Sequence, residues 1–191
     1  AYLKWLSSQK YTFAFVDGNH ENFDLIEQSP IREKWNGKVN EVYPGIYRLR
    51  RGEVYTINGK KIFVLGGAMS NPNQKEGNYS GRGRNKKLKL QKVWWEKEIP
   101  SKEEFSYALD NLKKHNNKVD YVLTHTCSTE TIKDIFHKTG RVDYNRLTDP
   151  VSIFLDKLNI EYKSWHFGHH HQDVDLGDRF CHYKKAPFEL F

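Results

Sequence analysis

The stretch Tyr11-Thr-Phe-Ala-Phe-Val-Asp-Gly-Asn-His-Glu21 carries the strongest structural signal in this sequence of 191 residues. Its first six residues form a short apolar and aromatic run, which is typical of a buried strand, and Asp-Gly-Asn then indicates a turn. Two later apolar runs end in a similar way, at His125 and at the Gly-His-His-His sequence of residues 168–171. Ligands gather at the carboxyl ends of strands in layered α/β folds, so we expect the polar residues that follow these three strands to lie close together.

Around these strands the chain mixes helix signals with further strand signals. Between residues 38 and 66, short apolar runs alternate with Pro-Gly, Arg-Gly and Asn-Gly, which predicts an antiparallel meander. Its strands are expected at 39–42, 46–49, 53–57 and 61–65. Helices are expected at 21–28, 101–115, 128–137 and 149–158, and a closing hairpin at 174–183. The pattern predicts an α/β fold with layered mixed sheets flanked by helices, formed by residues 1–191 as a single domain.

The composition is that of a basic, aromatic-rich globular protein. Lys and Arg number 31 against 24 Asp and Glu, which gives a net charge of +7, and aromatic residues make up 14% of the chain. These aromatic side chains can close a core that aliphatic residues alone would leave thin. No stretch approaches the roughly 18 apolar residues of a membrane helix, so we expect no membrane partner. Cys127 and Cys181 lie far apart without C-x-x-C spacing, which favours a reducing, cytoplasmic location.

The residue types at the three strand ends favour a metal site. Imidazole nitrogens and amide oxygens suit borderline divalent cations such as Zn, Mn, Fe or Ni. His169 and His171 are two residues apart, so at a turn they can face two adjacent metals. Taken alone, each residue also has a simpler interpretation: Asn19 can be a turn residue, and His125 can be a hydrogen-bonded core histidine.

The three motifs, taken in order, resemble those of the calcineurin-like metallophosphoesterases. That family carries G-N-H-[DE] after an apolar strand, then a lone histidine, then G-H-x-H. The corresponding residues here are Gly18-Asn-His-Glu21, His125 and Gly168-His-His-His171. The resemblance spans residues 11 to about 180 and looks most like small bacterial members. It implies the four-layer sandwich of that family and the hydrolysis of phosphate mono- or diesters.

The resemblance also implies a role for individual residues. Asn19, His125 and His169 match the protein ligands of one metal, and His171 matches a ligand of the other. His20 matches the residue that faces the substrate and assists the leaving oxygen or the transition-state charge. In the family, two divalent cations (Mn, Fe, Zn or Ni) hold a bridging hydroxide and clamp the oxygens of a phosphorylated substrate for in-line attack.

The sequence departs from the family pattern at two motifs. The family also has an earlier D-x-H and a G-D-x-x-D, which supply two ligands of one metal and the carboxylate that bridges both. Neither motif occurs here, since Gly177-Asp178 comes after the last motif and no Asp follows three residues later. We therefore expect the strands that carry them to precede Ala1. This chain alone is then expected to hold one metal or none and to hydrolyse little or no substrate, and adding the upstream segment should restore hydrolysis.

The other histidines and both cysteines are predicted to have structural roles. His166 lies within a strand and His170 occupies the variable position of the motif, so neither is expected to bind a metal. No neighbour suggests a lowered thiol pKa, so the cysteines are expected to be ordinary free thiols. Surface or packing roles are expected for His115, His137 and His182.

The basic stretch from Arg82 to Lys92 supports two interpretations. It can be a solvated insertion loop, or it can form an electrostatic collar for an anionic substrate such as a nucleotide or nucleic acid. Trp94 and Trp95 follow directly, and they can stack on bases or anchor the loop to the core. The alternatives to a phosphoesterase are therefore a nucleic-acid-binding protein or nuclease, and a non-catalytic scaffold of the same fold that binds a protein partner.

Overall fold

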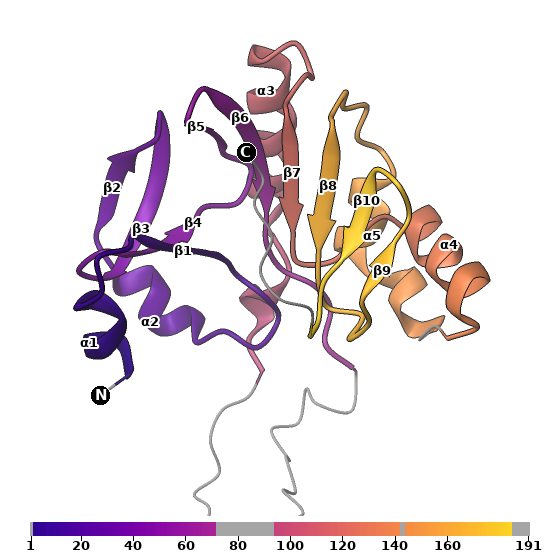
Figure 1. The fold of residues 1–191 in the computed structure, drawn as a ribbon, viewed down its shortest axis with the longest axis horizontal. Coiled ribbons are helices and arrows are strands. Elements are labelled where there is room, and N and C mark those ends of the chain that lie inside the picture. The colour runs from indigo at the N-terminus through magenta and orange to yellow at the C-terminus, as the bar shows by residue number, and fades with distance from the viewer. Residues whose placement is uncertain (1, 72–93, 142–143, 185–191) are drawn as a thin grey trace, which may run out of the picture.

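The computed structural model describes residues 2–71, 94–141 and 144–184, which form two mixed β-sheets flanked by helices (Figure 1). The four-stranded sheet has the order β1-β4-β3-β2, with β1 at Phe13–Val16, β2 at Ile31–Lys34, β3 at Gly37–Tyr43 and β4 at Ile46–Leu49. The six-stranded sheet has the order β5-β6-β7-β8-β10-β9, with β5 at Val54–Ile57, β6 at Lys60–Leu65, β7 at Tyr121–Thr124, β8 at Ser164–Phe167, β9 at Val174–Asp175 and β10 at Arg179–Cys181. The predicted α/β class with layered mixed sheets is therefore confirmed.

The helices begin where the sequence offers capping residues. Ser101 and Glu104 form a capping box at the start of α3, and Asp149 caps α5 with Pro150 in its first turn. The α-helices are α1 (Tyr2–Ser7), α2 (Phe23–Gln28), α3 (Lys102–Lys114), α4 (Thr129–Thr139) and α5 (Pro150–Leu155), and short 3₁₀ helices lie at Glu96–Glu98 (η2) and Tyr144–Thr148 (η3). Within the described ranges, no helix has the length and apolar character needed to cross a membrane.

The alternation of side chains along β6 separates two cores. Phe63 and Leu65 belong to the core that the six-stranded sheet forms with α3, α4 and α5. Ile62 and Val64 point to the opposite face and pack in the core between the two sheets. Both faces of β6 are thus buried over residues 62–65, which explains why these four residues form a continuous apolar run.

The predicted antiparallel meander over residues 38–66 is wrong in its connectivity. β3 pairs with β4 and β5 pairs with β6, both antiparallel, but the two hairpins belong to different sheets. The chain changes sheets at Gly52, which has φ of +80° and packs so closely on α3 that a Cβ there would lie 2.9 Å from the Ala108 Cα. The Arg-Gly sequence signals a turn of either kind, so it could not distinguish a third hairpin from a change of sheet.

Strand β2 was not predicted, because Ile31 is its single apolar residue and the strand lies exposed at a sheet edge. Its hairpin with β3 turns at Trp35 and Asn36, which both have positive φ. The three strands at whose ends the polar motifs were predicted to meet are β1, β7 and β8. β1 lies in the four-stranded sheet as a half-buried edge strand and the other two lie in the six-stranded sheet, so the site forms where the two sheets face each other.

Candidate metal centre

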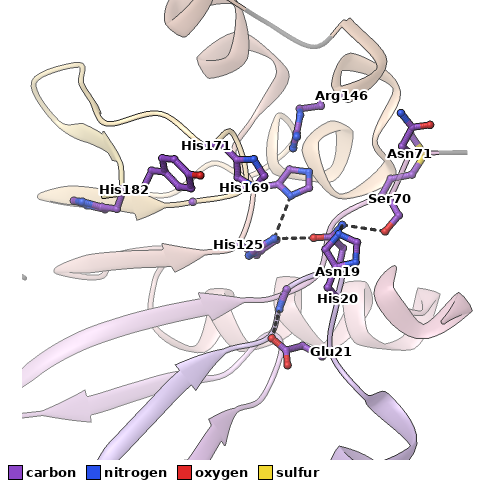
Figure 2. A pocket seen from close by; sticks show the side chains of 14 residues that line it. Asn19, His20, Glu21, Ser70, Asn71, His125, Arg146, His169, His171 and His182 are labelled. Atoms are coloured by element: carbon purple, nitrogen blue, oxygen red, sulfur yellow. Dashed lines mark hydrogen bonds between the residues drawn. The ribbon is translucent and has the colours of Figure 1, made fainter. Parts of the chain in front are cut away.

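The ends of β1, β7 and β8 bring Asn19, His125 and His169 into direct contact. His125 Nε2 lies 3.1 Å from Asn19 Oδ1 and 3.1 Å from His169 Nδ1. Figure 2 shows the three side chains pointing toward one another from both sheets, at one wall of a pocket of about 550 Å³. Asn19 lies 106 positions before His125 in the chain, and His169 lies 44 positions after it. The predicted convergence of these three residues is thus observed.

The two separations that His125 Nε2 makes, to Asn19 Oδ1 and to His169 Nδ1, are those of neighbouring ligands of a cation. Two ligand atoms at about 2.1 Å from a metal, at angles of about 90–110°, lie roughly 3.0–3.4 Å apart. An amide oxygen and two imidazole nitrogens are also a suitable donor set for Mn, Fe, Zn or Ni. Among the described residues no three His, Cys, Asp or Glu side chains group in this way, so the amide of Asn19 is essential to the set.

Burial keeps both imidazoles neutral. It lowers the pKa of His125 to about 4, and burial together with the nearby positive charge of Arg146 lowers the pKa of His169 as well. A neutral imidazole has a lone pair to give to a metal. His169 Nε2 is buried without a hydrogen-bond partner among the described residues, whereas His169 Nδ1 faces His125 Nε2.

The backbone that presents Asn19 is held by a buried ion cluster. Asp17, fully buried, accepts hydrogen bonds from Arg48 Nε at 2.7 Å and Arg51 Nε at 2.8 Å. Burial alone would raise the pKa of Asp17, but the two guanidinium groups outweigh it and hold that pKa below its usual value. Gly18 follows Asp17, and a Cβ at this position would lie 2.7 Å from the His125 ring. Because glycine has no side chain, the His125 imidazole can pack directly on the backbone here.

The two remaining predicted site residues, His20 and His171, line the same pocket. His20 is exposed, with Nε2 at 3.3 Å from Asn19 Nδ2. His171 has φ of +52° and stacks on the Tyr183 ring. The one carboxylate in the described lining, Glu21, accepts a hydrogen bond from the Gly18 backbone at 3.4 Å. All five predicted site residues thus border one pocket, and His125 contacts two of the others.

The histidines predicted to be structural have protein partners. His170 is buried, with Nε2 at 3.3 Å from Cys127 Sγ, and burial lowers its pKa to about 3. His166 Nδ1 lies 3.0 Å from His182 Nε2. His182 was predicted to have a surface or packing role, and it also lines the pocket. Cys127 and Cys181 are buried free thiols, and burial raises the pKa of both, as expected for unreactive cysteines.

Three residues of the site carried no recognisable signal in the sequence. Ser70 and Arg146 line the pocket, and Glu98 is buried behind Ser70, whose backbone N–H it binds at 2.7 Å. None of them belongs to a motif, and each depends on contacts between distant segments. Among the aromatic residues, Trp95 is buried and donates a hydrogen bond to Asp24 at 2.8 Å, so its ring anchors the chain. The basic stretch 82–92 lies outside the described residues.

Comparison with protein-family models and with curated proteins finds no match for this sequence.

Proposed function

We propose that this chain is a metal-dependent phosphoesterase of the calcineurin-like type, and that its two flanked sheets are the four-layer sandwich of that family. The observation that carries the proposal is that His125 Nε2 lies 3.1 Å from both Asn19 Oδ1 and His169 Nδ1, beside an open pocket. These residues come from three separate motifs, whose order resembles that of the family. Neutral nitrogen and oxygen donors at this spacing suit a divalent cation.

Asn19, His125 and His169 would hold the cation. When bound, it would act as a Lewis acid toward phosphoryl oxygens and lower the pKa of a bound water. The three ligands are neutral, so the charge of the cation would remain uncompensated and would favour an anionic substrate. We propose one cation for the described residues, because the contacts of His125 bring together three of the predicted ligands, whereas His171 is the single residue that matches a ligand of the second metal.

Two further side chains could act on a phosphate ester in the pocket. His20 Nε2 can accept a hydrogen bond from Asn19 Nδ2, and in that tautomer Nδ1 carries a proton that can be given to the leaving oxygen. Arg146 lies beside His169 and His171 at the pocket wall (Figure 2). Its planar guanidinium can bind two phosphoryl oxygens at once.

The proposal predicts Mn²⁺-dependent hydrolysis of p-nitrophenyl phosphate that is slow in this chain. His20→Ala should lower the rate by at least about 100-fold, because it removes the proton donor, while Mn²⁺ affinity measured by calorimetry stays within about twofold. The exposed His137 on α4 offers a matched control, and His137→Ala should hydrolyse like the original chain. Hydrolysis that resists EDTA, or that His20→Ala leaves unchanged, would contradict the proposal. Cation binding with no hydrolysis at all would favour the non-catalytic scaffold.

Arg146 gives a separate prediction about substrate binding. Replacing it with methionine should weaken inhibition by inorganic phosphate at least about tenfold, since a charge-assisted, two-pronged contact is lost. Arg146→Lys should fall between the two, because lysine keeps the charge without the planar fork. Mn²⁺ affinity should stay equal or rise, since a positive charge near the cation is removed. Unchanged phosphate inhibition in Arg146→Met would show that the guanidinium does not contact the anion.

A further inference from the structure

The amide of Asn19 can bind a cation in only one of its two orientations. Its oxygen must face the metal, because the NH₂ group has no lone pair to offer. Asn19 Oδ1 lies on the side of His125 Nε2, at 3.1 Å. On the other side, Asn19 Nδ2 donates to Ser70 Oγ at 2.9 Å and lies 3.3 Å from His20 Nε2. The orientation therefore depends on whether Ser70 Oγ offers a lone pair or a proton to the amide.

Glu98 determines which of these Ser70 offers. The Ser70 hydroxyl donates to Glu98 Oε2 at 2.6 Å, and the Ser70 backbone N–H donates to Glu98 Oε1 at 2.7 Å. Both oxygens of Glu98 therefore accept hydrogen bonds from Ser70, so the hydroxyl proton points at Glu98 and a lone pair of Ser70 Oγ points at Asn19. Both Ser70 and Glu98 are 1% exposed, so water does not offer the hydroxyl an alternative partner.

We infer that Glu98, acting through Ser70, sets the amide of Asn19 so that its oxygen faces the cation. Glu98 and Ser70 are thus positioning residues: they orient the ligand Asn19 and do not bind the cation themselves. This inference rests on the proposed cation site. Placing a carboxylate in a nearly fully buried position is costly. A glutamine of the same shape would be neutral, but its NH₂ group would donate a hydrogen bond where both oxygens of Glu98 accept one.

Glu98→Gln should reverse the hydrogen-bond direction along this chain of groups. The oxygen of the new side-chain amide has to stay on the Ser70 backbone N–H, which can only donate, and so the NH₂ of that amide faces Ser70 Oγ. The hydroxyl then accepts from position 98 and turns its proton toward Asn19. The amide of Asn19 rotates to accept it and presents NH₂ to the cation. We expect Mn²⁺ affinity to fall about 10–100-fold, the range for loss of an outer partner of a metal ligand.

A second substitution should reverse that loss. Asp at position 19 has two oxygens, so it can accept the reversed Ser70 proton with one and bind the cation with the other. Asn19→Asp should therefore raise Mn²⁺ affinity more in the Glu98→Gln background than in the original chain. In the original chain, the second carboxylate oxygen of Asp at position 19 would face a lone pair of Ser70 Oγ, which is unfavourable. A purely structural role for Glu98 would make the effect of Asn19→Asp equal in both backgrounds.

The orientation of the amide can be measured without any metal. In the NMR spectrum of the metal-free chain, the Asn19 side-chain NH₂ should show nuclear Overhauser contacts to Ser70, and in Glu98→Gln these should move to the His125 ring. Ser70→Ala removes the relay without reversing it and should weaken Mn²⁺ binding to an intermediate degree, which serves as the test if Glu98→Gln does not fold. Unchanged contacts together with unchanged affinity in these variants would overturn the inference. Moved contacts in a chain that binds no Mn²⁺ would support the relay and reject the proposed function.

Discussion

Replacing either His125 or His169 with alanine should weaken Mn²⁺ binding at least about 100-fold, or about 2.7 kcal/mol. Each substitution removes one of three donor atoms, of which His125 Nε2 lies 3.1 Å from both of the others. Calorimetric titration of the purified variants measures the loss directly. Circular dichroism would show that each variant is folded.

Two further histidines make this prediction specific. His171 stacks on the Tyr183 ring, so His171→Ala should change Mn²⁺ affinity by less than about threefold if one cation is held by the other three residues. A loss as large as that of His125→Ala would instead show that His171 shares in the same ion. His137 is exposed on α4, and His137→Ala should bind Mn²⁺ like the original chain. Equal binding by all four variants would exclude the proposed ligands.

Asp17→Asn should destabilise the fold by about 3 kcal/mol, because it removes the buried carboxylate that Arg48 and Arg51 share and leaves Arg51 with Glu104 as its remaining carboxylate partner. For a chain of this size, that corresponds to a drop in melting temperature of roughly 6–12 °C. Urea denaturation followed by circular dichroism measures the change. Asp110→Asn breaks an exposed pair with Lys113 and is a matched control, which should leave the denaturation midpoint nearly unchanged.

The effect of Asp17→Asn should also depend on pH. Folding lowers the pKa of Asp17, so the stability it contributes is present above its unfolded pKa, about 3.9, and is lost as the pH falls through the folded pKa. The difference in stability between the original chain and Asp17→Asn should therefore be full at pH 7 and should shrink below about pH 4. A difference that stays constant into the acid range would show that the ion cluster is not its cause.

The sequence predicted the candidate site better than it predicted the sheets. Asn19, His125 and His169 could be found because each follows an apolar strand directly, and the carboxyl ends of such strands meet in layered α/β folds. The change of sheet at Gly52 could not be found, because the same turn residues serve a hairpin and a crossover. Strand β2 was missed because an exposed edge strand needs no apolar periodicity.

The residues that orient Asn19 could not be predicted from the sequence, for a different reason. Ser70 lies 51 residues from Asn19, and Glu98 lies a further 28 along the chain. Neither stands in a pattern with the ligand motifs, and their hydrogen bonds form only when three segments pack together. No sequence pattern indicates that Ser70 and Glu98 form a buried pair, whereas the structure shows their hydrogen bonds and the contact of Ser70 with the Asn19 amide.

The most direct test of the cation site is a crystal of this chain soaked in MnCl₂ and measured for anomalous scattering. The account predicts an anomalous peak about 2.0–2.3 Å from Asn19 Oδ1, His125 Nε2 and His169 Nδ1, which disappears in His125→Ala. A peak at other residues, or no peak at a Mn²⁺ concentration that saturates binding in solution, would contradict it.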